Sequence, residues 1–182
     1  MCPKLHDRIG FNPLSREPQP MPEDFRAVCS RFATGIAVLA VLDEHGNPHG
    51  LTINSFTSVS AEPPLVLVCV DMACTLRPLF EAAPHFGLTF LEEHQQDISD
   101  RFAFVPERRF EGVKWKPSPM GDVPWIEDAL AWLECRIVER HSVGDHRILI
   151  GQVLTAVASP IADQPLLYFR SGYKRLLVDE AL

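Results

Sequence analysis

The amino-acid sequence predicts a mainly β protein, a single antiparallel barrel domain with accessory helices. Three observations predict this class. Short apolar runs bounded by Gly, Pro, Asn and Asp recur along the chain, the connections between them are short, and the last third alternates apolar and polar residues over two long segments. With 182 residues, 46% of them apolar, the chain is long enough to bury one sizeable core.

The N-terminal part predicts a flexible leader followed by a helix. Residues 1–22 contain many prolines and polar residues without a period, and we expect the folded domain to span residues 23–182. Pro22 and the acidic pair after it are typical of a helix start. The apolar side chains then recur at helical spacing: Phe25, Val28, Cys29 and Phe32. We expect this helix to pack on the rest of the domain.

The next segments predict a hairpin, a strand and a helix. Residues 34–42 form an apolar run, and the turn-rich residues 43–50 separate it from a second extended run. Residues 63–71 predict a central strand, introduced by two prolines that can begin a strand but not occupy its middle. Residues 75–83 predict a helix with Thr75 as its cap.

The middle of the chain predicts a strand, a helix and a loop. Residues 85–91 favour a strand and residues 92–104 a helix. Residues 106–125 are rich in Gly and Pro, so we expect an irregular loop that covers a site or an interface.

The last third gives the clearest strand pattern. Residues 130–143 and 146–159 flank a turn at Gly144-Asp145, and residues 165–170 predict a final strand. The alternation places Leu133, Cys135 and Ile137 on the core face of the strand. Their neighbours lie on the opposite face: Glu134, Arg136 and Val138.

Charge and composition argue against several classes of protein. The chain has 24 acidic and 17 basic residues, and its basic groupings are too short for a nucleic-acid surface. It shows neither a secretory signal nor an apolar run long enough to cross a membrane, so we expect a cytoplasmic protein. The five cysteines form no CxxC pair, which indicates reduced and mostly buried thiols rather than disulfides or a metal site. His45 and His49 flank a turn and are not expected to bind a metal.

The common catalytic motifs are absent from the sequence. The ten glycines never form GxG, so the glycine-rich fingerprint of a Rossmann dinucleotide-binding unit is missing. The sequence also lacks a GxxxxGK phosphate loop, a GxSxG elbow and an HExxH pair.

The segment richest in polar side chains is GLTINSFTSVS, residues 50–60, between two apolar strands. Its hydroxyl groups could satisfy nearby backbone groups, as in an ordinary strand and turn. Alternatively, its small side chains could let a planar ligand approach the backbone, whose N–H and C=O groups would bind the polar edge of that ligand.

Five blocks resemble, in order and spacing, the short-chain flavin reductase family, the reductase components of two-component flavin-dependent monooxygenases. The blocks cover residues 23–178 and read RFATGIAVLA, GLTINSFTSVSAEPPLVLVCVD, FGLTFLEEHQQDISDRFA with RFEGVKW, LAWLECRIVERHSVGDHRILIGQV and PLLYFRSGY. The resemblance implies a split β-barrel of the FMN-binding type, antiparallel and Greek-key-like, and a homodimer with flavin near the dimer interface.

The resemblance also implies a set of flavin contacts. Residues 52–55 would line the isoalloxazine ring mainly through backbone groups, and residues 58–60 would lie close to the ring or the ribityl chain: Thr52, Ile53, Asn54, Ser55, Ser58, Val59 and Ser60. The phosphate would lie near Asp71 to Thr75, where relatives often carry an Arg or Asn and a Ser. Free N–H groups at a helix start favour an anion, which keeps Thr75 a candidate donor. The resemblance does not decide whether the flavin is FMN or FAD.

The remaining site candidates come from the same resemblance. His146, in the turn Gly144-Asp145-His146, would position the nicotinamide and supply a proton to the reduced flavin; from spacing alone it only follows a hairpin turn. Tyr173 would pack beside the cofactor, whereas Tyr168 fits barrel packing equally well. Arg101 could face a phosphate or form a surface ion pair with Asp97.

The function that the resemblance implies is hydride transfer from NADH or NADPH to FMN or FAD, with reduced flavin passed to a partner monooxygenase. A flavoprotein on the same barrel that holds its flavin tightly and carries electrons is the alternative. A cofactor-free binding module and a reductase of metal complexes are also open. Turnover of NADH with excess free flavin would separate the reductase from the electron-carrying flavoprotein, because a carrier would show little NADH turnover.

Overall fold

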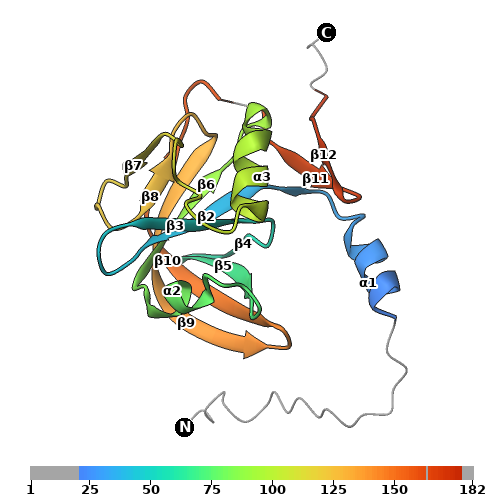
Figure 1. The fold of residues 1–182 in the computed structure, drawn as a ribbon, viewed down its shortest axis with the longest axis horizontal. Coiled ribbons are helices and arrows are strands. Elements are labelled where there is room, and N and C mark those ends of the chain that lie inside the picture. Colours follow the sequence, from blue (N-terminus) through green and yellow to red (C-terminus); the bar gives the residue numbers. More distant parts are fainter. Residues whose placement is uncertain (1–20, 163, 178–182) are drawn as a thin grey trace.

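The computed structural model describes residues 21–162 and 164–177 (Figure 1). The predicted leader, apart from Met21 and Pro22, lies outside the described residues. None of the helices in the described ranges combines the length and the apolar character that a membrane crossing requires. The fold is mainly antiparallel β, as the strand patterns predict.

The centre of the fold is a seven-stranded antiparallel sheet in the order β3-β2-β6-β9-β10-β5-β4. Its strands span Ala37–Leu42 (β2), Pro48–Ile53 (β3), Thr57–Ala61 (β4), Pro64–Asp71 (β5), His85–Phe90 (β6), Ala131–Val143 (β9) and His146–Ala158 (β10). The turn at Gly144-Asp145 joins β9 and β10 as predicted, whereas β4 was not predicted as a strand.

The two edge strands of this sheet lie close together. The chain leaves β3 at Ile53 and enters β4 at Thr57, so residues 54–56 alone connect opposite edges of the seven-stranded sheet. A few residues span little more than about 10 Å even when fully extended. The sheet must therefore curl until its edges nearly meet, which gives a barrel that is split between β3 and β4.

Two apolar clusters lie on opposite faces of β2. Leu39 and Val41 belong to the cluster inside the barrel, together with Phe86 and Leu149, whereas Val38 belongs to a second cluster beneath α3 (Gln96–Phe104). Both faces of β2 are buried, which explains why residues 34–42 are continuously apolar rather than alternating.

Smaller elements surround the barrel. They are α1 (Pro22–Cys29), α2 (Arg77–Ala82), η2 (Glu93–Gln95) and the short strands β1 (Thr34–Gly35), β7 (Trp115–Pro117), β8 (Pro124–Ile126), β11 (Leu167–Phe169) and β12 (Gly172–Lys174). β1, β11 and β12 form one small sheet, and β7 and β8 another.

The first helix differs from its prediction. α1 has the predicted Pro22 start, but none of its residues is buried, and it stands off from the sheets in Figure 1. Phe25, Val28 and Phe32 are 61, 70 and 77% exposed. The helix therefore buries no side chain against the other described residues, and its apolar side chains, like Phe32 after it, are exposed there.

The predicted alternation in β9 fails at Glu134. Its side chain is fully buried, and one carboxylate oxygen accepts a hydrogen bond from the Met120 backbone N–H at 3.2 Å. The reason is that residues 106–125 do not form a wholly irregular loop. Their end forms the β7–β8 hairpin, whose buried Val123 and Trp125 cover the face of β9 that the sequence assigns to solvent.

The cysteines are less buried than expected. Among the described cysteines Cys135 is buried, Cys69 and Cys74 are partly buried, and Cys29 is exposed on α1. Burial, with the nearby Glu134 as a smaller contribution, raises the pKa of the Cys135 thiol to about 12. This thiol is therefore a core side chain and not a nucleophile.

Candidate functional site

Three neighbouring cavities follow the segment from Leu51 to Thr57, where the barrel splits. We call them the turn cavity, the middle cavity and the outer cavity, with volumes of about 380, 190 and 510 Å³. The turn and middle cavities share Thr52 and Ala103 as lining residues, and the middle and outer cavities share Asn54 among others. Together they form one groove, called the split groove below, of the size that ligand sites in proteins have.

The turn cavity lies at the end of β5. The backbone reverses there through Asp71, whose carboxylate accepts a hydrogen bond from the Ala73 N–H at 2.7 Å. Thr75 lines this cavity but is not the cap of α2, because the helix begins at Arg77 with Leu76 as its N-cap. The predicted cap is wrong by one residue: Arg77 and Pro78 occupy the first helical turn, and Thr75 belongs to the preceding turn.

Arg109 supplies the positive charge of the turn cavity, a role that no pattern in the sequence predicts. Its guanidinium donates to the Gly50 carbonyl at 2.8 Å and to the Val105 carbonyl, and it lines the cavity opposite the Asp71–Thr75 turn. Burial lowers the pKa of Arg109. Within the described residues no carboxylate forms an ion pair with it, so an anionic ligand would offset the cost of its partial burial.

Arg101 fixes the loop that carries Arg109. It donates to the backbone carbonyls of Arg109 and Glu111, both at 2.6 Å, rather than forming the surface ion pair with Asp97 that its spacing allows. The helix α3 therefore positions Arg109 through this loop. Arg108 and Arg109 are adjacent arginines with nothing in the sequence to tell them apart, and the folded loop directs only Arg109 into the turn cavity.

The middle cavity is lined by Thr52, Asn54, Ser99 and Tyr173. The Thr52 hydroxyl donates to the Ser99 carbonyl at 2.6 Å, which ties β3 to α3. The Tyr173 hydroxyl donates to the Asp100 carboxylate at 2.6 Å and lies 2.9 Å from the Ser99 hydroxyl. Burial and the Asp100 hydrogen bond raise the pKa of Tyr173, so its hydroxyl stays protonated and its single proton remains in the hydrogen bond to Asp100.

The outer cavity is bounded by Thr34 and Gly35 on one side and by residues 53–57 on the other. The Thr34 hydroxyl is buried and has no hydrogen-bond partner among the described residues. By contrast, the Ser55 hydroxyl is used by the fold: it donates to the Cys69 carbonyl and accepts from the Cys69 N–H, at 3.1 and 3.0 Å. Side-chain hydroxyls of this segment thus hold distant backbone groups and leave the segment's own backbone beside the cavity.

Four predicted site residues do not line the split groove of the single chain. Ser58, Val59 and Ser60 lie on the edge strand β4, with Val59 49% exposed. His146 lies at the start of β10, where its Nδ1 is 2.7 Å from the Asp145 carboxylate. The other predicted residues do line the groove: Thr52, Ile53, Asn54, Ser55, Thr75 and Tyr173.

The arrangement suits a long, flat and partly anionic ligand. The split groove offers a guanidinium at one end, buried or protonated hydroxyls in its middle and outer parts, and apolar walls that include Phe56, stacked edge-on against Phe90 at 4.8 Å. The residues present therefore fit a flavin. The orphaned Thr34 hydroxyl is a free hydrogen-bonding group in the same groove.

Comparison with known proteins gives one consistent result. The model of the family described as flavin reductase like domain matches residues 29–177. The reductase subunit of a flavin-dependent monooxygenase from Mycobacterium tuberculosis (strain ATCC 25618 / H37Rv) is 36% identical over 153 residues, which cover 84% of this chain and 81% of that protein. A flavin reductase (NADPH) from Lentzea aerocolonigenes is 39% identical and is covered to 84%, with 80% of this chain matched.

Solved structures agree with the sequence comparisons. The NADH:FAD oxidoreductase of Streptomyces globisporus C-1027, in complex with NAD and FAD fragments, superimposes with a TM-score of 0.82 at 34% identity, covering 91% of this chain and all of that chain. The styrene monooxygenase flavin reductase of Pseudomonas putida S12 gives a TM-score of 0.77, also at 34% identity, with 86 and 99% of the two chains covered.

Proposed function

The chain belongs to the flavin reductase like domain family, and we propose that the split groove is its flavin site. It is an NAD(P)H-dependent flavin reductase that supplies reduced flavin to a monooxygenase partner. The observation that carries this assignment is the position of residues 51–57. They connect the two edges of the barrel, and three cavities with a cation at one end lie along them.

The proposed contacts follow from the groove. Arg109 and the Asp71–Thr75 turn hold the phosphate, the Asn54 side chain binds a polar edge of the flavin, and the backbone of residues 52–55 lies along the ring. The Tyr173 hydroxyl oxygen accepts a hydrogen bond from the flavin, because its own proton is donated to Asp100. A bound flavin would supply the hydride acceptor, its N5 atom, for the nicotinamide C4. The protein must hold these two atoms about 3–3.5 Å apart and exclude water from between the two rings.

His146 is proposed to act on the nicotinamide side. Its Nδ1 bonds to Asp145, so the ring orientation is fixed and Nε2 is left to contact a ligand. Pairing of β10 with β5 places His146 opposite Asp71, beside the turn that lines the groove. The side chain is 43% exposed, so a second molecule can reach it from solvent.

The homodimer is proposed from the uncovered apolar surface. Phe25, Val28 and Phe32 are the most exposed apolar side chains of the α1 region, and a helix that is amphipathic but unburied requires a partner surface. Phe32 also lines the outer cavity, so a second copy that covers α1 would close this end of the split groove. Exposed Val59 on β4 is a further candidate for that interface.

The test is a comparison of free and bound flavin as electron acceptors. We expect the purified protein to oxidise NADH or NADPH continuously when free FAD or FMN is in excess, because a reductase releases its reduced flavin. A single stoichiometric reduction followed by no turnover would instead support a flavoprotein that carries electrons. A protein that takes up no flavin at all would support a binding module without a cofactor.

A further inference from the structure

Phe104, the last residue of α3, lines the middle cavity of the split groove with an uncovered ring. It is 79% exposed among the described residues, whereas Phe102 is completely buried and packs edge-on against Phe110 at 4.8 Å. Two positions correspond to about 200° of rotation around a helix, so α3 turns Phe102 toward the apolar cluster and Phe104 away from it. A single exposed apolar side chain is ordinary on a protein surface, but this one forms part of the wall of a cavity.

The backbone that carries Phe104 is held on both sides of the residue. The Thr52 hydroxyl donates to the Ser99 carbonyl at 2.6 Å, which ties α3 to β3. Directly after the helix, the Val105 carbonyl accepts a hydrogen bond from Arg109 Nε. The Phe104 ring therefore moves by rotation about its own side-chain bonds, which takes picoseconds to nanoseconds for an exposed residue.

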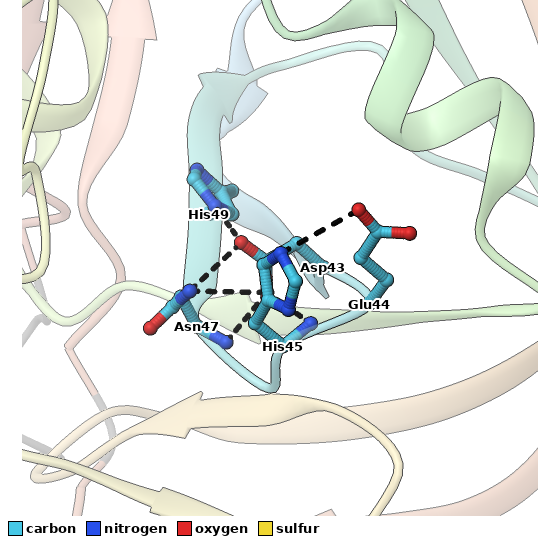
Figure 2. Close-up of polar contacts among 5 residues, drawn as sticks. All are labelled: Asp43, Glu44, His45, Asn47 and His49. Atoms are coloured by element: carbon cyan, nitrogen blue, oxygen red, sulfur yellow. Dashed lines mark hydrogen bonds and ion pairs between the residues drawn. The ribbon is translucent and has the colours of Figure 1, made fainter.

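The strand β3, which contributes Thr52 to the middle cavity, is fixed by the turn that precedes it (Figure 2). The Asp43 carboxylate in this turn accepts hydrogen bonds from the Asn47 side-chain amide at 3.0 and 3.2 Å. It also accepts from Nε2 of His49, the second residue of β3, at 3.1 Å. The strand is therefore held at its start by Asp43 and near its end by Thr52, so this wall of the cavity does not move with the ligand.

The other aromatic residues that line the middle cavity are two partly buried tyrosines. Tyr168 and Tyr173 pack edge-on with their ring centroids 5.7 Å apart, and the Tyr173 hydroxyl is bonded to Asp100. The middle cavity has a volume of about 190 Å³, against about 380 Å³ for the turn cavity and about 510 Å³ for the outer cavity. The split groove is therefore smallest where Phe104 lines it, and a flat ligand that extends along the groove contacts this ring.

We propose that Phe104 packs against the isoalloxazine ring of a flavin in the split groove and slows the departure of that flavin. This assignment rests on the flavin site proposed above and adds to it the residue that sets how long the flavin stays bound. Two aromatic rings attract each other in offset-stacked or edge-on arrangements, and this contact is lost when the flavin leaves. Its loss therefore raises the dissociation rate more than it changes the association rate.

A second copy of the chain or the nicotinamide could cover Phe104 instead of the flavin. The flavin is favoured because Phe104 borders a cavity that also contains the polar side chains Asn54 and Tyr173, the composition of a small-molecule site. If a second copy covered Phe104, Phe104→Ala would lower the mass of the protein in solution. If the nicotinamide contacted it, the same substitution would raise the KM for NADH at saturating flavin.

The experiment measures association and dissociation rates of FMN and riboflavin with the full chain by stopped-flow fluorescence. Riboflavin has the same ring system without the phosphate, so the two ligands should respond alike. Phe104→Ala should raise both dissociation rates by about fivefold to tenfold and change the association rates by less than about twofold. Phe104→Tyr keeps the ring and should stay within about twofold of the native rates. An effect on FMN alone, or an equal loss in Phe104→Tyr, would contradict contact with the flavin ring.

Met120, in the turn between β7 and β8, provides a matched control. It is 62% exposed and lines none of the three cavities of the split groove, so Met120→Ala should change neither rate. A folded Phe104→Ala variant with native rates, a lower mass or a raised KM for NADH would overturn the inference. Two rates that rise together and leave Kd unchanged would also overturn it, because no packing contact would then be lost. Failure of the proposed function is distinct: the native protein itself would then bind no flavin.

Discussion

His146 lies directly opposite Asp71 in the antiparallel register of β10 and β5. The Asp145 carbonyl next to it accepts a hydrogen bond from the Met72 N–H at 2.8 Å, which ties the tip of the β9–β10 hairpin to the turn at the end of β5. The histidine of the hairpin and the proposed phosphate turn of the split groove are thus held together by backbone pairing. Residues far apart in the sequence become neighbours at one end of the proposed site.

The first prediction concerns His146. We expect His146→Ala to lower kcat/KM for NADH by about tenfold or more, because the nicotinamide loses the side chain that orients it, while the Kd for flavin changes by less than about twofold. Stopped-flow reduction and flavin titration measure the two quantities. Asp145→Asn is the control for imidazole orientation and should cause a smaller loss of the same kind. Equal losses of turnover and flavin affinity would assign His146 to flavin binding or folding.

The second prediction concerns Tyr173. Removal of its hydroxyl in Tyr173→Phe should weaken flavin binding by about threefold to tenfold, the range of one hydrogen bond in a partly buried site. Because the pKa of Tyr173 is raised, flavin affinity of the native protein should not fall between pH 7 and the ordinary tyrosine pKa of 10.0. Tyr168, whose ring lies 5.7 Å from that of Tyr173, provides the control Tyr168→Phe. Similar losses in both variants would contradict a specific role for Tyr173.

The third prediction separates two glycines. A Cβ at Gly35, which lines the outer cavity, would meet no atom within 4 Å, whereas a Cβ at Gly151 would lie 2.5 Å from Phe86 Cζ. Gly151→Ala should therefore destabilise the core by about 1–3 kcal/mol and lower Tm by several degrees. Gly35→Phe should keep Tm nearly unchanged but weaken flavin binding, since its ring would occupy the outer cavity. Unchanged flavin affinity in folded Gly35→Phe would count against that part of the groove.

The fourth prediction concerns pH. Arg147 donates to the Glu81 carboxylate through Nε at 3.2 Å and Nη2 at 2.9 Å, and these hydrogen bonds lower the pKa of Glu81 from its ordinary value of 4.5. This contribution to stability is fully present above pH 4.5 and is lost as the pH falls through the lowered folded-state pKa. Glu81→Gln should lower Tm at pH 7, and the difference from the native protein should shrink at acid pH. The exposed Glu111 is the control, and Glu111→Gln should change Tm little.

The fifth prediction concerns the dimer. Phe25→Ser with Val28→Ser should remove apolar side chains that the single chain leaves uncovered, so the variant should shift from dimer toward monomer without loss of its own fold. Light scattering after size exclusion measures the mass, and circular dichroism checks the fold. Replacing the charged Glu23, also on α1, by Gln is the control. A native protein that is monomeric at micromolar concentration would refute the proposed interface.

Local patterns predicted most elements of the barrel because strand periodicity and turn residues are local signals. The hairpin at Gly144-Asp145 and the strand at residues 64–71 lie where the sequence places them. The failures depend on long-range packing. Glu134 is buried because the distant β7–β8 hairpin covers it, and α1 buries none of its residues against the part of the chain that the structure describes. Neither fact is encoded in the periodicity of the segment concerned.

The site was predictable only in part for the same reason. The polar segment at residues 50–60 concentrates hydroxyl and amide side chains between two apolar strands, so the sequence alone marks it as a candidate site. Arg109 was not, because two adjacent arginines differ only in which one the loop turns inward, and that is decided by hydrogen bonds to Gly50 and Val105. Thr34 is a single hydroxyl at the end of an apolar run, and its orphaned hydroxyl is visible only in the folded chain.

The most direct measurement is a crystal structure of the protein with FAD. We expect the isoalloxazine ring to lie along the backbone of residues 52–55 with one face open to a nicotinamide, and the phosphate next to the ribityl chain to contact Arg109. A flavin bound elsewhere, with the split groove filled by the protein's own side chains, would contradict it.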